Sequence, residues 1–312
     1  MAYGTVLQEQ RKRLHERTGQ ALEALYTATL HEHYSDLAHH YRRSPNTEKA
    51  IHYLHLAGQQ AVQRSAHTEA ISHLTTALDL LLTRPETPER AAQELTLRLA
   101  LGPVLMATQG YTAPEVAQFY SRARVLCEQL GNSPQLFPVL YGLWVFHTVR
   151  GELRTAQSLA QECLRIAKQT NEEGVLVEAH FAVGTTSLWR GEFSHAHATY
   201  EEGVAYYQSQ QHQALIALYG GYDPGVTCLC HVALVLWCLG YPEQAMMRSH
   251  EALRLAQDLG YFLSLAFSLT FAAWLHLERG EEKIAQERAD AAVALSSEHG
   301  FPYWEAWGIL RR

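Results

Sequence analysis

The amino-acid sequence predicts an all-α fold made of consecutive antiparallel helix pairs. Ala and Leu, which favour helices, account for 85 of the 312 residues, whereas the β-branched Val and Ile account for 22. The chain also repeats internally, because a glycine followed five residues later by an alanine recurs at intervals of 40, 49 and 40 residues. Such a period is typical of stacked helix pairs. The residues expected to form the turn and the closest helix packing of each repeat are Gly151 and Ala156, Gly191 and Ala196, Gly240 and Ala245, and Gly280 and Ala285.

Each repeat is predicted to contain two helices with the glycine between them. Residues 174–190 carry apolar side chains at helical spacing, and 192–207 form the second helix after the break at Gly191. Along every second helix small residues recur at spacings of 3 and 4, which places them on one face and allows a neighbouring helix to approach closely. Helix ends are expected at residue types that accept the left-handed C-cap conformation, namely Gly131, Asn171, Gly260 and Gly300.

The segments outside the four clear repeats follow the pattern less regularly. Residues 31–133 are predicted to form degenerate helical repeats, which include helices at 89–108 and 114–130. Pro114 suits the first turn of the later helix, where its missing N–H leaves no helical hydrogen bond unmade. The glycine- and proline-rich cluster GGYDPG at 220–225 is predicted to be a turn, and it accounts for the one interval of 49 residues.

The regular repeats extend over residues 134–300. Residues 301–312, with the sequence FPYWEAWGILRR, are predicted to form the first helix of a further repeat that has no second helix. Because natural solenoids usually end in a polar capping helix, this pattern predicts that the chain is a fragment of a longer protein.

The repeat unit resembles the tetratricopeptide repeat (TPR), in which a small residue of the first helix, a glycine turn and two small residues of the second helix recur. The resemblance implies a right-handed α-solenoid of antiparallel helix pairs. The chain departs from the usual TPR length by its period of about 40 residues, which implies longer helices. Trp144 also stands where the first helix of the first repeat usually has a small residue.

A closer resemblance rests on three stretches, which are AYGTVLQEQRKRLHERTGQALEAL together with DLAHHYRRSPNTEKAIHYLHLAGQQAVQRSAHTEAISHLTTALDLL, then GYDPGVTCLCHVALVLWCLGYPEQAMMRSHEALRLAQDLG, and finally HGFPYWEAWGILRR. They resemble the TPR region of large bacterial signalling proteins, in which a class III adenylate or guanylate cyclase, or another output domain, is joined to a STAND-type ATPase and then to TPRs. The resemblance implies that residues 1–30 are the helical tail of the ATPase module. It also implies that the cyclase and ATPase modules lie upstream, so none of their catalytic residues is expected here.

Composition indicates which classes of partner the protein can bind and in which cellular compartment it is expected. The formal net charge of −7 argues against general affinity for nucleic acid. Five cysteines, an odd number, and an N-terminus without a signal-peptide pattern predict a reducing, cytoplasmic environment. The apolar stretches at 226–239 and 262–277 are shorter than the roughly 20 residues that a helix needs to span a bilayer, so no membrane span is expected.

The sequence contains no motif that predicts catalysis. It has no Walker A pattern and no GxGxxG, GxSxG, HExxH or CxxC pattern, so neither an enzyme nor a cofactor site is expected. His33, Asp36 and His40 have the spacing i, i+3, i+7, which would let them share a helix face and bind Zn²⁺ with a fourth ligand. A helical metal-dependent enzyme is therefore the less favoured alternative, and a solvated helix face is the simpler interpretation.

The first helices of TPR solenoids line a concave surface, so the resemblance implies an apolar and aromatic partner surface. This predicted partner surface consists of Tyr141, Val145, Phe181, Thr185, Trp189, Leu234, Trp237, Phe267, Thr270 and Trp274. The alternative is that these residues pack inside a tight superhelix or against the missing modules. The main hypothesis is a non-catalytic TPR scaffold for protein–protein interaction, which acts as the sensor or regulatory arm of a cytoplasmic signalling ATPase or nucleotide cyclase. Its partner would be a protein, a peptide or the modules of the parent chain, and a stand-alone TPR adaptor is the alternative function.

Overall fold

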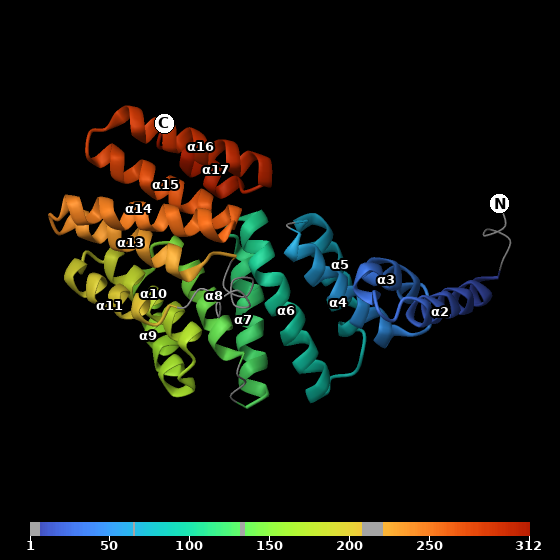
Figure 1. Ribbon diagram of the computed structural model, residues 1–312. Helices are drawn as coiled ribbons and strands as arrows, with labels where there is room; N and C mark the ends of the chain where they lie inside the picture. Colours follow the sequence, from blue (N-terminus) through green and yellow to red (C-terminus); the bar gives the residue numbers. More distant parts are fainter. Residues whose placement is uncertain (1–6, 65, 132–134, 208–220) are drawn as a thin grey trace. The chain divides into compact units, whose positions relative to one another are not determined.

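The computed structural model describes residues 7–64, 66–131, 135–207 and 221–312, and the regular structure in these ranges is helical without a strand (Figure 1). The predicted all-α fold is therefore confirmed. The elements are α2 (Gln8–Leu25), the 3-10 helix η1 (Leu30–His33), α3 (Tyr34–Arg42), α4 (Thr47–Gln63), α5 (His67–Leu82), α6 (Pro88–Gln109), α7 (Pro114–Gln129), α8 (Leu136–Val149), α9 (Leu153–Thr170), α10 (Glu173–Trp189), α11 (Phe193–Ala205), α13 (Pro224–Cys238), α14 (Pro242–Leu259), α15 (Phe262–Glu278), α16 (Glu282–His299) and α17 (Pro302–Ile309).

The chain divides into two compact units. The first unit consists of Met1–Val104 with Glu128–Gly131, and the second consists of Leu105–Cys127 with Asn132–Arg312. The two helices predicted at 89–108 and 114–130 are present as α6 and α7, and Pro114 begins α7 as expected.

In the first unit, α3, α4 and α5 pack successively against one another, and α2 packs against α3. The α4–α5 contact is close because a Cβ added to Gly58 would lie 2.6 Å from Cγ of the buried Leu74. Glu23 of α2 is fixed to α4 by two hydrogen bonds, since its carboxylate accepts from Nζ of Lys49 and from the hydroxyl of Tyr53, both at 2.6 Å. These contacts make α2 a packed part of the first unit.

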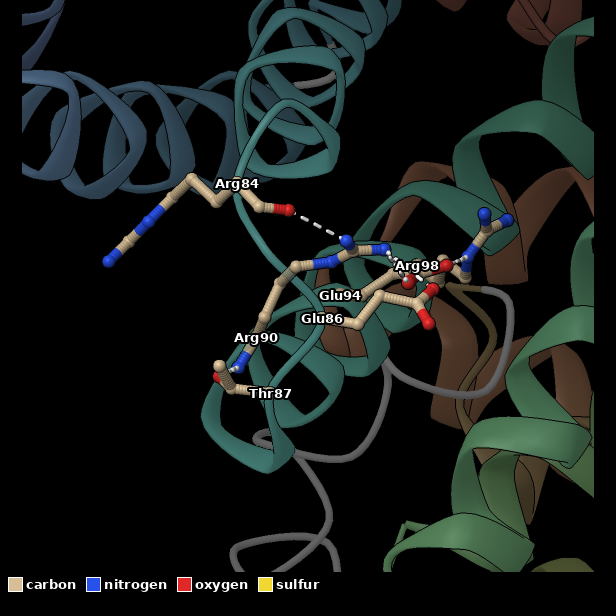
Figure 2. A network of polar contacts seen from close by, with 6 residues as sticks. All are labelled: Arg84, Glu86, Thr87, Arg90, Glu94 and Arg98. Carbon is tan, nitrogen blue, oxygen red and sulfur yellow. Dashed lines mark hydrogen bonds and ion pairs between the residues drawn. The ribbon is translucent and has the colours of Figure 1, made fainter.

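The first part of α6 carries a buried carboxylate between two arginines. Glu94 is 1% exposed, and its carboxylate accepts a hydrogen bond from Nε of Arg98 at 2.9 Å and lies 3.9 Å from a guanidinium nitrogen of Arg90. The spacing of four residues on each side places all three side chains on one helix face. Arg90 also donates to the Arg84 carbonyl oxygen at 2.8 Å, which ties α6 to the preceding connection. Figure 2 shows this network of Arg84, Glu86, Thr87, Arg90, Glu94 and Arg98.

The second unit contains the predicted antiparallel pairs, which are α8 with α9, α10 with α11, α13 with α14, and α15 with α16 (Figure 1). The second helices bury one stripe of small and apolar residues, as α9 does with Ala156, Ala160 and Cys163. The first helices are apolar around most of their circumference because each packs against its own second helix and against neighbouring repeats. α17 packs against α16 and α15 in the same way.

In each repeat the recurring alanine lies in a buried helix contact, and the recurring glycine has a positive φ angle. The four repeated alanines, Ala156, Ala196, Ala245 and Ala285, are at most 1% exposed. The four repeated glycines have φ angles between 73° and 85°, a backbone conformation in which a side chain would be strained. The expected left-handed helix ends are also present, since Gly131, Asn171, Gly260 and Gly300 have φ angles of 70°, 54°, 70° and 73°. These C-cap predictions are confirmed.

The turn predicted at 220–225 lies only partly within the described residues. From residue 221 onward the chain leads directly into α13, and the Asp223 carboxylate caps this helix by accepting a hydrogen bond from the N–H of Val226 at 3.0 Å. Pro224 occupies the first turn of α13. Residue 220 and the preceding 208–219 lie outside the described residues.

Candidate protein-interaction site

The structure divides the predicted partner surface into a buried half and a partly exposed half. Five of its side chains are at most 6% exposed, because the first helices pack against one another and against their second helices. These five are Tyr141, Thr185, Leu234, Phe267 and Thr270. They line no surface of the described chain, and the alternative of internal packing holds for them.

A row of aromatic side chains crosses the second unit, and the buried Tyr141 and Phe267 lie against it, with ring centroids 4.9 Å from Trp144 and 5.8 Å from His231. Phe181 of α10 is at the centre of this row, with ring centroids 5.9 Å from Trp144 of α8 and 5.0 Å from His231 of α13. The row continues because the His231 ring lies 4.8 Å from Phe271 of α15. Trp144 fills the place where the TPR pattern has a small residue, and its indole N–H donates to the hydroxyl of Thr186 at 2.9 Å. The aromatic row is thus a packing element that joins four consecutive first helices.

Glu178 and His231 are among the titratable groups enclosed in this core. Burial raises the pKa of Glu178 to about 8, and the hydrogen bond that Oε2 accepts from the Tyr141 hydroxyl at 2.8 Å opposes this shift without cancelling it. Burial also lowers the pKa of His231 to about 4, and its Nδ1 lies 2.9 Å from the Thr227 carbonyl oxygen. Both groups are therefore neutral near pH 7, and their role is in packing.

In the partly exposed half of the predicted partner surface, Trp189 is exposed, and Val145, Phe181, Trp237 and Trp274 are half-buried. Trp189 is the last residue of α10 and is 45% exposed. Its ring stacks on Trp274 of α15, with centroids 6.4 Å apart and an angle of 16° between the planes. Trp237 of α13 is half-buried and packs against a buried cluster of the core instead. Trp189 and Trp274 are therefore in ring contact, and Trp237 packs elsewhere.

The structure adds Trp307 and Arg311 to this pair. The Trp307 ring of α17 lies 6.3 Å from that of Trp274, and the Arg311 guanidinium lies 4.5 Å from the Trp274 ring and 5.1 Å from the Trp307 ring. We call Trp189, Trp274 and Trp307 the tryptophan cluster. The sequence predicted a helix at Trp307 but assigned this residue to no surface. The last helix is not followed by the recurring glycine and alanine, so its alignment with the other repeats could not be deduced.

The histidine trio considered as a metal site does not assemble. Nδ1 of His33 lies 3.4 Å from the Asp36 carboxylate, but His40 points to α2, where its Nδ1 lies 3.0 Å from Nδ1 of His15. In the described part of the chain no group of three or more His, Cys, Asp or Glu side chains is arranged to hold a metal ion. The helical metal enzyme thus loses the ligand set on which it was based.

None of the described helices is both long enough and apolar enough to cross a membrane. The two apolar stretches at 226–239 and 262–277 belong to α13 and α15, which are first helices of their repeats.

No family model matches the sequence. An uncharacterized protein of Rhizobium meliloti (strain 1021) is 26% identical over 269 residues, which cover 86% of this chain and 26% of that protein. The chain therefore spans about a quarter of the length of this relative.

Solved structures share the fold at low identity. A tetratricopeptide repeat protein from Parabacteroides merdae matches with a TM-score of 0.61 and 11% identity, over 94% of this chain and 99% of that one. A Rap protein complexed with competence and sporulation factor matches with a TM-score of 0.60 and 13% identity, over 92% and 80%. A STAND protein with a tetratricopeptide repeat sensor from Pyrococcus horikoshii matches with a TM-score of 0.53 and 12% identity, over 97% and 43%. The chain thus has the fold of a TPR-like helical solenoid.

Proposed function

We propose that the chain is a non-catalytic scaffold for protein–protein interaction. The observation that carries this proposal is the tryptophan cluster, in which large aromatic side chains from three first helices meet and one of them is 45% exposed. Tryptophan is enriched at protein interfaces and among the residues that dominate their binding energy. The partner is a protein or a peptide, and neither nucleic acid nor a membrane is required.

We further propose that this scaffold is the sensor or regulatory arm of a cytoplasmic signalling ATPase or nucleotide cyclase. The likeness to a STAND protein with a TPR sensor and the much greater length of the Rhizobium relative support this view. In this proposal residues 1–30 are the helical tail of the preceding ATPase module, 31–133 are degenerate helical repeats, 134–300 are the four regular repeats, and 301–312 are the first helix of a further one. A partner that binds one conformation of the solenoid better than another would shift the attached module between its states.

A stand-alone adaptor is the second candidate function. The observation that favours it is the match to the Parabacteroides TPR protein, which extends over nearly all of both chains. In this case the tryptophan cluster would hold a partner without regulating an attached enzyme.

The decisive experiment uses the complete reading frame that contains this sequence. Nucleotide hydrolysis and cyclase activity would be measured for the intact protein and for a form that lacks residues 31–312. We expect nucleotide turnover whose rate or regulation changes when the scaffold is removed. A reading frame that encodes no nucleotide-binding module would contradict the regulatory arm and leave the adaptor. Nucleotide turnover that the deletion does not change would contradict a role of the scaffold as either sensor or regulator.

A further inference from the structure

We propose that the open face of Trp189 binds an arginine side chain of a basic partner segment. This inference rests on the proposed function as an interaction scaffold and specifies the chemistry of the partner. Three observations support it, which are the guanidinium already held by the neighbouring indoles, the convergence of three helix C-termini, and the acidic character of this part of the chain.

Arg311 shows which group the tryptophan cluster accommodates. Its guanidinium lies 4.5 Å from the Trp274 ring and 5.1 Å from the Trp307 ring, both within the range of a cation–π interaction. In the described part of the chain, no Lys or Arg side chain lies over the ring of Trp189, a residue that stacks on Trp274 and is 45% exposed. Trp189 thus extends the same row of indoles and leaves a face for a second cation.

The backbone around the cluster also favours a positive charge. Trp189 is the last residue of α10, Trp274 lies in the last turns of α15, and Trp307 lies in the last turn of α17. The carbonyl end of a helix carries a partial negative charge, and cations are stabilised near it. Three such ends meet here, since the three rings are in consecutive contact.

Arg311 brings one positive charge to the cluster, and Glu278, which acts electrostatically on Arg311, offsets it. The Glu278 carboxylate accepts a hydrogen bond from the Trp274 indole N–H at 3.0 Å, which places an anion beside the cluster. Arg190, next to Trp189, is paired with Glu192 at 2.9 Å and donates to Gln157 at 2.7 Å, so its charge is largely compensated. Residues 105–312 carry 14 Lys and Arg against 21 Asp and Glu, and this excess of negative charge favours approach of a basic segment.

Arginine fits these features better than lysine does. Its guanidinium is planar and weakly hydrated, so it stacks on an indole face, whereas an ammonium group retains its water. The flexible side chain can reach Trp189 from a peptide that lies across the ends of α10 and α15, without entering the buried aromatic row. The surface therefore selects for the guanidinium group and not for positive charge alone.

The test is a fluorescence-anisotropy titration of the full chain with labelled hexa-arginine and hexa-lysine peptides at physiological salt. We expect hexa-arginine to bind about fivefold more tightly than hexa-lysine, in line with the strength of a partly exposed cation–π contact. Trp189→Ala should weaken hexa-arginine binding about fivefold, and Trp189→Phe should lie between the two. The matched control is Tyr241→Ala, which removes an aromatic ring that is 52% exposed outside the cluster and should leave binding within twofold of the original.

Equal affinity for the two peptides, or hexa-arginine binding that Trp189→Ala leaves unchanged, would overturn the inference. Absence of hexa-arginine binding would overturn it as well. Thermal melts of each variant establish that the folded chain is being compared. If Trp189→Ala weakens hexa-arginine binding as expected while the intact parent protein with the same change still regulates its nucleotide turnover, the inference stands and the regulatory partner binds elsewhere. Loss of arginine selectivity with regulation retained removes this inference alone.

Discussion

Replacing Glu178 with Gln should make the second unit more stable at alkaline pH. The Glu178 carboxyl group is 3% exposed, and burial raises its pKa to about 8 from an ordinary value of 4.5. A carboxyl group with a raised pKa binds its proton more tightly in the folded chain than in the unfolded chain. Its contribution to stability is therefore complete below pH 4.5 and is lost progressively as the pH rises to 8.

The size of the effect follows from the two pKa values. A shift of about 3.5 pH units corresponds to roughly 5 kcal/mol of unfolding free energy, of which about 3 kcal/mol is lost between pH 6 and pH 9. Gln has nearly the same shape and no charge, and its amide oxygen can accept the hydrogen bond from the Tyr141 hydroxyl. A Gln that packs as the neutral Glu178 does should therefore make the chain about 2 kcal/mol more stable than the original at pH 6 and about 5 kcal/mol more stable at pH 9.

The assay is urea unfolding of both proteins at pH 6, 7.5 and 9, followed by the fluorescence of the second unit's tryptophans. The control is Glu298→Gln, which removes an exposed carboxylate from α16 and should not alter the pH profile. If Glu178→Gln loses as much stability from pH 6 to pH 9 as the original chain does, Glu178 is ionised in the folded state and the reasoning is wrong.

Three further predictions concern packing and protonation. Ala196→Leu should cost roughly 1–3 kcal/mol of unfolding free energy because Ala196 is fully buried, whereas Ala198→Leu on the exposed side of the same helix should cost much less in parallel urea melts. Acid should weaken the second unit through His231, whose pKa is lowered to about 4 by burial, so stability falls by roughly 3 kcal/mol as the pH drops from 6.5 to 4; His231→Gln should remove this part of the profile. Trp304→Ala should cost ~3–5 kcal/mol, because Trp304 is 7% exposed and its indole N–H donates to the Tyr222 hydroxyl at 2.8 Å, and an unchanged thermal midpoint would show that it is not core.

Local signals were sufficient to predict the helix pairs and their ends. A helix that ends with φ near +70° strongly favours glycine at that position, so the glycine is a clear signal of the helix end in the sequence. The small residues of the second helices were equally informative, because close packing at Ala156 or Ala196 leaves no room for a larger side chain. Both signals depend on residues within one helix pair.

The exposure of the first helices could not be predicted in this way. α10 and α13 are apolar on nearly all sides, so no periodicity indicates which face remains open. Contacts between segments that are distant in the sequence could not be predicted either. One example is the contact between His40 and His15, which are 25 residues apart. The buried Glu178 gave no signal, because a single carboxylate in an apolar helix has no pattern, and its pKa depends on the helices that surround it.

The position of the tryptophan cluster links binding to the arrangement of the repeats. Trp189 and Trp274 belong to α10 and α15, which are not consecutive first helices, because α13 lies between them in the order of the repeats. Their contact therefore depends on how the intervening repeat sets the distance between its neighbours. A partner held on Trp189 would favour those arrangements in which the cluster is intact, in proportion to the difference in its affinity for the alternatives. Under the proposed function, this is a physical route by which an event at the ends of three helices changes the packing of the whole second unit.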